Sequence, residues 1–329
     1  MGVEIMKFRL GLMAKPAGGA YDVIIVGGGP AGLSAALYSK RFGLNTAVIT
    51  EKIGGSLTEA GLIDDYIGIP EIMGPDLARK FEEHVRKYNV PIILDKVEKV
   101  TRESNVFKVT TRTGTEFTAK AVIIAVGSKR KKLGVPGEEE FRGRGVTYCA
   151  PCDAPLFKDK VTAVVGGGNA ALQAALLLAE YSPKVYLIHR RDEFRAFKAY
   201  VDLIKRNDRI EPVLNTVVVR IGGDKTVKWI EVKNVKTGET SKIEVEGVVI
   251  EVGSVPPKEF FEAIGLKTDE KGFVEVGPGQ ETNIPGVFAA GDCTAGPHKK
   301  KFDQVVTAAA EGAVAALSAY EYILNLGKR

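Results

Sequence analysis

The stretch Tyr21-Asp-Val-Ile-Ile-Val-Gly-Gly-Gly-Pro-Ala-Gly32 decides the fold of this chain. Its first half, Tyr21–Val26, is an apolar run with the length and β-branched content of a buried parallel strand. Its second half reads G-x-G-x-x-G and leads into an alanine-rich, helix-like segment. In this pattern Gly27 makes a tight turn, Gly29 lets the backbone approach a pyrophosphate, and Gly32 lets the helix contact the strand.

The sequence beyond this turn completes a nucleotide-binding unit. A second strand is predicted at Thr46–Ile49, and Glu51 follows 19 residues after Gly32. A carboxylate at this place binds ribose hydroxyls, and phosphate binds at the helix N-terminus. A glycine string alone also fits a plain βαβ turn, but strand, helix, strand and acid in register predict a nucleotide site. The flexible loop Ile53–Ser56 lets a large cofactor pass along the backbone. Candidate contacts are Gly27, Gly29, Pro30, Ala31, Gly32, Glu51, Gly55, Ser56 and, after the later strand Ala121–Val126, Gly127.

A second turn, Gly166-Gly-Gly-Asn-Ala-Ala171, has the G-x-G-x-x-A form and follows the apolar run Val161–Val165. A helix to about Tyr181 and a strand at Lys184–Ile188 complete its βαβ unit. Where the first unit has an acid, this one has a basic run. Its candidate contacts are Gly166, Gly168, Asn169, Ala170, His189, Arg190, Arg191 and Arg195.

The basic run predicts which nucleotide the second site prefers. A carboxylate would repel a 2′-phosphate, whereas guanidinium groups bind it through bidentate, charge-assisted hydrogen bonds. The sequence therefore predicts NADPH rather than NADH. The alternative is a solvated basic start of a helix, and Asp192 and Glu193 among the arginines weigh against the prediction.

Between the two turns lies Tyr148-Cys-Ala-Pro-Cys-Asp153. Cys149 and Cys152 can close into a small ring that opens with two electrons. Zinc is a poorer interpretation because the chain has no second pair or clustered histidines, so no metal site is predicted. A carboxylate beside Cys152 raises the pKa of the thiol unless it is itself protonated, which makes Asp153 a candidate proton donor. The alternative is that Asp153 caps a helix start.

Length and composition limit the class of protein. A chain of 329 residues is longer than the chains that usually fold around a single hydrophobic core, so about two domains are expected. The net charge of +5 is mild, and the clusters Lys129–Lys132 and Lys299–Lys301 are interpreted as solvated surface rather than a nucleic-acid patch. With three cysteines, no signal-like apolar run at the start and no stretch long enough to span a bilayer, we expect a cytoplasmic protein without nucleic-acid or membrane partners.

The element order predicts an α/β fold with two Rossmann-like dinucleotide-binding domains, the second inserted into a discontinuous first. The first domain is expected at 1–131 and 257–329, with 1–20 as a loose N-terminal extension. The inserted domain is expected at 132–256 and carries the cysteine pair. Glycine and proline mark hinges at Leu133–Gly137 and Val255–Pro257.

The remaining patterns predict elements around these two units. A helix is expected at Pro75–Tyr88, with an apolar core stripe at its Leu77, Phe81 and Val85. Residues 91–120 and 210–252 alternate like antiparallel strands, and the latter are expected to form a hairpin layer on the inserted domain. A short strand before Asp292 and a helix at Val306–Leu324 belong with the first domain.

With these residues in view, the chain resembles the low-molecular-weight thioredoxin reductases, flavoproteins with two dinucleotide-binding domains. The likeness runs from about Tyr21 to the C-terminal helix. It rests on Gly27–Gly32, Cys149–Asp153, His189–Arg195 and Val287–Asp292. The resemblance implies FAD in the first domain, NADPH in the inserted domain, and a homodimer.

The resemblance also implies roles for single residues. Asp292 bonds the ribityl chain of the flavin, and Gln304 lies near the isoalloxazine. Cys152 faces the flavin, Cys149 attacks the disulfide of the partner protein, and Asp153 moves a proton. The family alternates two domain orientations, because the nicotinamide and the dithiol must take turns at one flavin face.

The chain departs from the family pattern at several positions. Asn169-Ala170 stands where Asp-Ser is common, Ser56 where Gln is common, Ala154 where Gly is common, and Asp303 where Arg is common. The first departure bears on the pyrophosphate contacts, and the last on nicotinamide docking or flavin potential. Cys293 is interpreted as a buried small residue rather than a third redox thiol.

The leading hypothesis is an NADPH-dependent reductase of a thioredoxin-like or glutaredoxin-like protein. The alternative is an NADPH oxidase or a peroxiredoxin-system flavoprotein. Relatives of the peroxide type usually carry extra domains before the first turn, and about 20 residues cannot hold one. Ferredoxin–NADP reductases of similar architecture lack the cysteine pair. A flavin-binding regulatory protein without turnover would have an unreactive dithiol.

Overall fold

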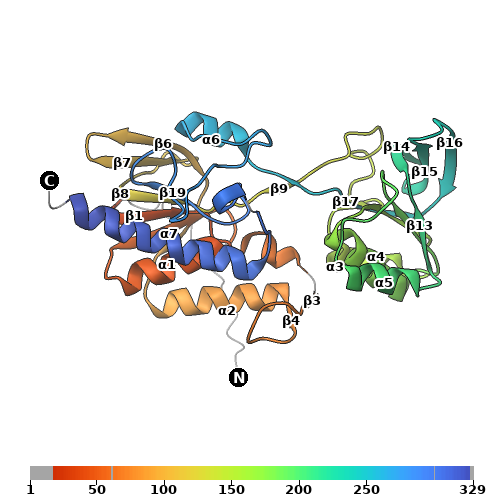
Figure 1. Cartoon of the computed structure of the whole chain (residues 1–329), viewed down its shortest axis with the longest axis horizontal. Coiled ribbons are helices and arrows are strands. Elements are labelled where there is room, and N and C mark those ends of the chain that lie inside the picture. Colours follow the sequence, from red (N-terminus) through yellow and green to blue (C-terminus); the bar gives the residue numbers. More distant parts are fainter. Residues whose placement is uncertain (1–17, 61, 300, 327–329) are drawn as a thin grey trace, which may run out of the picture. The chain divides into compact units, whose positions relative to one another are not determined.

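The computed structural model describes residues 18–60, 62–299 and 301–326. The chain divides into two compact units, and both are discontinuous in sequence. The first unit comprises residues 1–55, 79–127 and 258–329, and the second comprises 56–78 and 128–257. Figure 1 follows the chain from one unit to the other and back. The loose extension expected at 1–20 falls, up to residue 17, outside the described residues.

The first unit is built on a sheet with the order β5-β2-β1-β8-β7-β6, and β19 also pairs with β8. Strands β5, β2, β1, β8 and β19 run parallel, whereas β6 and β7 form an antiparallel extension. The strand bounds are β1 Ala20–Val26, β2 Thr46–Thr50, β5 Ile92–Leu94, β6 Val97–Glu103, β7 Val106–Thr111, β8 Glu116–Ile124 and β19 Val287–Ala289.

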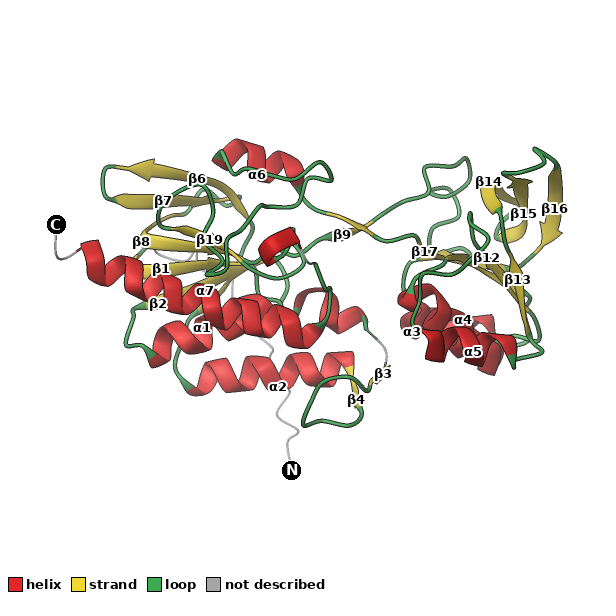
Figure 2. Ribbon diagram, viewed as in Figure 1, coloured by secondary structure: helices red, strands yellow, loops and turns green. Residues whose placement is uncertain are grey.

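Alternation along β1 divides the core of this unit into two layers. Val23 and Ile25 face a cluster with the helices α1 and α7, whereas Ile24 and Val26 face a cluster that includes Phe261 of α6. Figure 2 shows α1, α2 and α7 on one face of the sheet and α6 on the other. The helix bounds are α1 Pro30–Arg41, α2 Gly74–Lys87, α6 Lys258–Ile264 and α7 Val305–Leu326.

Two predictions for these elements are confirmed and one is wrong. In α2 the expected stripe is inside, since Leu77 and Val85 are buried and Phe81 packs against the core. The final strand and helix return as β19 and α7. However, the predicted hairpin region and the buried strand at 121–126 are not separate, because β8 is continuous from Glu116 to Ile124. Its first half, up to Ala119, pairs with β7, and the part from Thr118 to Ile124 pairs with β1, which explains both patterns.

The second unit contains a fully parallel sheet with the order β10-β17-β11-β12-β13. A cluster around Leu172 and Leu178 of α4 covers one face, and residues of the small sheet β14-β15-β16 cover the other. The bounds are β10 Val146–Thr147, β11 Thr162–Gly166, β12 Val185–Ile188, β13 Ile210–Val213, β17 Gly247–Glu251, α3 Ala150–Asp153, η2 Ala154–Phe157, α4 Asn169–Tyr181 and α5 Lys198–Lys205.

The hairpin layer expected over 210–252 is smaller than predicted. Only β14 Thr216–Gly223, β15 Val227–Asn234 and β16 Thr240–Glu244 form the antiparallel sheet. The outer parts of the range, β13 and β17, join the parallel sheet. Strand β17 is an unbroken apolar run, which a strand buried on both faces requires and which alternation rules do not detect.

The two connections near residues 129 and 254 pair with each other. Strand β9, Lys129–Arg130, runs antiparallel to β18, Ser254–Val255, and the amide of Lys131 donates to the carbonyl of Gly253. Short elements complete the chain: η1 Gly55–Glu59, β3 Leu62–Ile63, β4 Ile72–Met73 and η3 Pro297–Lys299. No helix within the described ranges has the length and apolar character needed to cross a membrane.

Candidate active site

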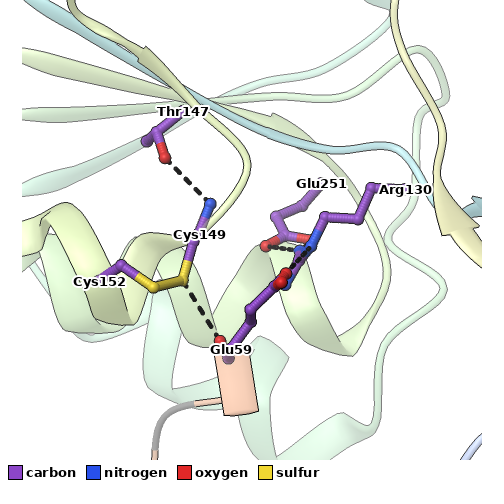
Figure 3. Close-up of polar contacts among 6 residues, drawn as sticks. All are labelled: Glu59, Arg130, Thr147, Cys149, Cys152 and Glu251. Carbon is purple, nitrogen blue, oxygen red and sulfur yellow. Dashed lines mark hydrogen bonds and ion pairs between the residues drawn. A yellow bond between two sulfur atoms is a disulfide. The ribbon is translucent and has the colours of Figure 1, made fainter. Parts of the chain in front are cut away.

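The cysteine pair lies where β10 ends and the short helix α3 begins. Cys149 and Cys152 form a disulfide, and the amide of Cys149 donates to the hydroxyl of Thr147 at 3.0 Å. The Sγ of Cys149 lies 3.3 Å from the carbonyl oxygen of Glu59 (Figure 3). A disulfide sulfur carries no proton, so this is a contact rather than a hydrogen bond. Cys152 is exposed, and Cys149 is half-buried.

Asp153 directly follows the pair. It is the last residue of α3 and the residue before η2, and its side chain makes no capping hydrogen bond. The helix-cap alternative therefore finds no hydrogen bond to support it. The carboxyl group is half-buried and adjacent in sequence to Cys152, where it can exchange protons with a sulfur.

A buried carboxylate fixes the segment that leads into the cysteine pair. Glu138 is 2% exposed and accepts the hydroxyl of Tyr148 at 2.6 Å. It also accepts the amides of Leu133 and Gly134 at 2.9 and 2.6 Å. Burial and this carboxylate raise the pKa of the Tyr148 hydroxyl, so Tyr148 stays a donor. The loop 133–137 is thereby tied to the residue that precedes Cys149, an arrangement that the sequence did not predict.

The first glycine turn has room only for glycine at its outer positions. Gly27 has a φ of +111°, and a Cβ there would lie 2.2 Å from the carbonyl of Ala125. A Cβ at Gly32 would lie 1.9 Å from the carbonyl of Gly27. At Gly29, by contrast, a Cβ would meet no described atom within 4 Å, so this face of the turn is open.

Open space at Gly29 coincides with the start of α1. The helix begins with Pro30 and Ala31, has no side-chain cap and carries no acid in its first turn. Its first amides therefore point out of the turn without a partner from a capping side chain, which is the arrangement that binds phosphate.

The other first-unit candidates surround this turn or follow neighbouring strands. The amide of Gly54 donates to the carbonyl of Gly28 at 2.7 Å, which holds Gly55 beside the turn, and Ser56 follows it in η1. Glu51 lies just past β2, is exposed, and ion-pairs with Arg112 at 3.3 Å. Gly127 follows β8 with a φ of +63°.

Asp292 and its surroundings form a partly buried charged group after β19. Burial and the nearby Asp303 raise the pKa of Asp292 to about 6, against the attraction of Lys301. The ammonium of Lys301 donates to the backbone carbonyl of Asp292 at 2.7 Å and ion-pairs with Asp303. Asp303, which stands where the family pattern has Arg, is therefore paired with a cation. Gln304 directly precedes α7, and its carbonyl accepts the amide of Ala308.

Cys293, next to Asp292, is completely buried. Its Sγ lies 3.3 Å from the carbonyl of Ala290, and burial raises the pKa of the thiol to about 12. A thiol that stays protonated and out of solvent is a poor nucleophile, so the interpretation as a small core residue is confirmed.

The second glycine turn repeats the first. Gly166 has a φ of +158°, and a Cβ there would lie 2.2 Å from the carbonyl of Glu251. A Cβ at Gly168 would meet no described atom within 4 Å, and α4 begins there without a side-chain cap. Asn169, the first residue of α4, accepts the amide of Phe197 at 2.8 Å, and Ala170 follows it.

The basic run after β12 folds back onto this turn. The imidazole of His189 fills the space over Gly167, where a Cβ would lie 2.2 Å from its Nδ1. Burial lowers the pKa of His189, and its Nε2 has no hydrogen-bond partner within the described part of the chain. The amide of Arg195 donates to the carbonyl of Gly167 at 2.7 Å. The structure thus brings the turn and the basic run together.

The charged residues of this run differ in exposure and in pairing. Arg190 is exposed, and Arg191 is half-buried. Asp192, whose charge weighed against NADPH, ion-pairs with Lys236 at 3.0 Å, and this lowers the pKa of its carboxyl group. The pair joins the run to the turn between β15 and β16, 44 residues later in sequence. Because of this pairing, the carboxylate adds little net negative charge beside the arginines.

Sequence reasoning missed one partly buried ion pair. Arg130 of β9 donates from Nη1 to both carboxylate oxygens of Glu251 at 2.7 and 2.8 Å (Figure 3). Its Nε also lies 3.9 Å from a carboxylate oxygen of Glu59. The one signal in the sequence was the acid that ends the apolar run Gly247–Ile250. Burial raises the pKa of Glu251 even though Arg130 acts against it.

Comparison with known proteins agrees with this geometry. The family model described as pyridine nucleotide-disulphide oxidoreductase matches residues 21–312. The chain is 38% identical to thioredoxin reductase of Bacillus subtilis over 93% of its own length and 96% of that protein's. It is 36% identical to one of the alkyl hydroperoxide reductase subunits of Escherichia coli over 93% of its length but only 59% of that protein's. A crystal structure of Lactococcus lactis thioredoxin reductase superposes with a TM-score of 0.88, at 37% identity over 93% of this chain and 99% of that one.

Proposed function

The chain belongs to the pyridine nucleotide-disulphide oxidoreductase family, and we propose that it is an NADPH-dependent flavoprotein that reduces the disulfide of a thioredoxin-like protein. The observation that carries this function is the Cys149–Cys152 disulfide, which follows a strand of the same parallel sheet as the second glycine turn. Likeness to thioredoxin reductases over nearly the whole chain supports the choice of substrate.

FAD supplies a two-electron carrier that accepts hydride from NADPH and passes electrons to a disulfide. The first unit fits this group, because α1 offers uncapped amides beside the open face of Gly29. Glu51 would accept the ribose hydroxyls, while Asp292 and Gln304 would lie along the ribityl chain and the ring. The proposed contacts are Gly27, Gly29, Pro30, Ala31, Gly32, Glu51, Gly55, Ser56, Gly127, Asp292 and Gln304.

NADPH would bind at the second turn. Its pyrophosphate would lie at the open face of Gly168, and its 2′-phosphate would lie at the basic run after β12. The ion pair between Asp192 and Lys236 supports this preference, because it neutralises the nearby acid. The proposed contacts are Gly166, Gly168, Asn169, Ala170, His189, Arg190, Arg191 and Arg195.

The cysteine pair would transfer electrons to the partner protein in two displacements. The thiolate of Cys149 attacks one sulfur of the partner disulfide and forms a mixed disulfide, and the other partner sulfur leaves with a proton supplied by Asp153. Cys152 then attacks the Sγ of Cys149, which releases the second partner sulfur and restores the Cys149–Cys152 disulfide. One partner disulfide becomes a dithiol in each cycle.

The partner would be a thioredoxin-like or glutaredoxin-like protein, and we expect the enzyme to act in the cytoplasm as a homodimer. Apolar side chains on α7 support self-association, since several are more than a third exposed. These are Val306, Val314, Leu317 and Leu324.

Steady-state turnover tests the function. With NADPH and a thioredoxin disulfide, wild type should produce thioredoxin thiols, and Cys149→Ser and Cys152→Ser should each lower kcat at least about a thousandfold because the relay is broken. Cys293→Ser, which alters a buried thiol outside the relay, is the matched control and should keep the wild-type rate.

The second candidate function is reduction of a peroxiredoxin or of oxygen, favoured by the 36% identity to the alkyl hydroperoxide reductase of Escherichia coli. If wild type and Cys149→Ser oxidise NADPH with oxygen at equal rates and form no thiols, the protein is an oxidase and the proposed function is wrong. Faster turnover with a peroxiredoxin disulfide than with thioredoxin would identify a peroxiredoxin as the partner, and electron transfer through the cysteine pair would still hold.

A further inference from the structure

The Arg130–Glu251 pair is partly buried, and one guanidinium nitrogen contacts both carboxylate oxygens, yet the proposed function gives it no role. The Glu251 side chain is 11% exposed and that of Arg130 is 34% exposed. Burying such a pair costs desolvation, and apolar replacements of similar volume are often as stable. Because the carboxylate is mostly buried, stability alone is a weak reason for charges at this place.

The pair stands at the ligand-binding edge of the parallel sheet. Glu251 is the last residue of β17, and it lies in register with Gly166 of the second glycine turn. On its other side β17 pairs with β10, whose end at Thr147 leads to the cysteine pair. The sheet order β10-β17-β11 therefore puts Glu251 between the cysteine pair and the glycine turn.

The course of a dinucleotide over this edge follows from the topology. The chain proceeds from β11 to β12 and β13 in one direction and returns to β17 on the other side of β11. Dinucleotides bind across the point where the strand order reverses. With the pyrophosphate at the turn after β11 and the 2′-phosphate at the end of β12, the nicotinamide half would extend over the end of β17.

The chemistry of the pair matches the group that would arrive there. The carboxamide of nicotinamide offers an amide donor and a carbonyl acceptor, and a carboxylate beside a guanidinium offers one acceptor and one donor. Nη1 of Arg130 alone serves both oxygens of Glu251, so the Nη2 hydrogens and further lone pairs on the oxygens are not used within the pair.

We propose that Arg130 and Glu251 bind the nicotinamide carboxamide of NADPH and so position the ring for hydride transfer. Glu251 accepts the amide N–H, and Arg130 donates to the amide carbonyl. The pairing of β9 with β18 holds Arg130 at this place. The contact deepens the proposed function and rests on it.

Binding titrations that separate the two halves of the dinucleotide test the contact. Holoenzyme is titrated calorimetrically with NADP⁺ and with 2′,5′-ADP, which lacks the nicotinamide half. Glu251→Gln and Arg130→Lys should each lower the affinity for NADP⁺ at least about tenfold, as expected for one lost hydrogen bond to a charged group. Their affinity for 2′,5′-ADP should stay within about twofold of wild type. Glu211→Gln removes an ion pair with Lys184 in the same unit and should leave the affinities for both ligands unchanged.

An analogue tests the carboxamide itself. Wild type should discriminate against the 3-acetylpyridine analogue of NADP⁺, which has no amide N–H, and Glu251→Leu, which leaves no acceptor, should lose most of that discrimination. If a single variant fails to fold, the double variant Arg130→Met with Glu251→Leu replaces the ion pair by an apolar pair. It should weaken the binding of NADP⁺ and leave the binding of 2′,5′-ADP unchanged. Unchanged NADP⁺ affinity, or equal losses for NADP⁺ and 2′,5′-ADP, would overturn the contact. A wild type that binds neither ligand would instead contradict the proposed function.

Discussion

The first glycine turn, Gly27–Gly32, and the second, Gly166–Ala171, start their helices in the same way and differ in two places. Both have an open face at the third residue, Gly29 or Gly168, and a helix that begins without a side-chain cap. They differ at the sixth residue, which is Gly32 in one and Ala171 in the other. They also differ after the next strand, where Glu51 stands in one unit and His189-Arg190-Arg191 in the other.

These differences have separate physical causes. The sixth residue is set by backbone clearance, because a Cβ at Gly32 would lie 1.9 Å from a carbonyl, whereas Ala171 already fits a completely buried space. After the second strand, His189 is packed over Gly167, whereas the exposed Arg190 and the half-buried Arg191 are free of such packing and are proposed to match the charge of the ligand. Under the proposed function, a turn of one shape serves two nucleotides, and the side chains after the next strand distinguish them.

The largest effect is expected from giving the first turn the sixth residue of the second. Gly32→Ala forces a methyl group into the carbonyl of Gly27, so we expect a loss of at least about 2 kcal/mol in unfolding free energy and poor retention of FAD. The reverse change, Ala171→Gly, removes a methyl group from a helix and should cost only about 1 kcal/mol. Thermal unfolding and flavin absorbance of the purified proteins measure both. A Gly32→Ala protein with wild-type stability and flavin content would contradict the role of backbone clearance at the sixth residue.

A smaller effect is expected from removing the charge difference. Arg190→Gln with Arg191→Gln should raise the KM for NADPH about a hundredfold, because hydrogen bonds between charged groups contribute roughly 1.5–3 kcal/mol each. The KM for NADH should change little. Arg112→Gln, which removes the partner of Glu51 beside the first site, is the matched control and should leave both values unchanged. An equal rise for NADH and NADPH would mean that the arginines do not read the 2′-phosphate.

Much of this comparison was predictable because its elements are local in sequence. Both turns, their helices and the core stripe of Leu77 and Val85 follow from patterns that span fewer than about 20 residues. The exposed Glu51 and the half-buried Arg191 also lie at the strand ends where the motif spacing puts them.

The parts that were not predictable depend on residues far apart in the chain. Arg130 and Glu251 are separated by 121 residues, and only the sheet order and the pairing of β9 with β18 bring them together. The neutralisation of Asp192 depends on Lys236, which lies in the turn between β15 and β16. The misassigned strands β8 and β17 have the same cause, since partners on both sides and not local alternation decide their extent.

The central claim is that electrons pass through the cysteine pair and not only through the flavin. Anaerobic titration with NADPH tests it most directly, because each mole of NADPH delivers two electrons. Wild type should take up about two equivalents per chain, one for FAD and one for the Cys149–Cys152 disulfide, and Cys149→Ser should take up about one. In Cys149→Ser a long-wavelength absorbance should report the thiolate of Cys152 against oxidised flavin. Uptake of one equivalent by wild type would contradict the relay.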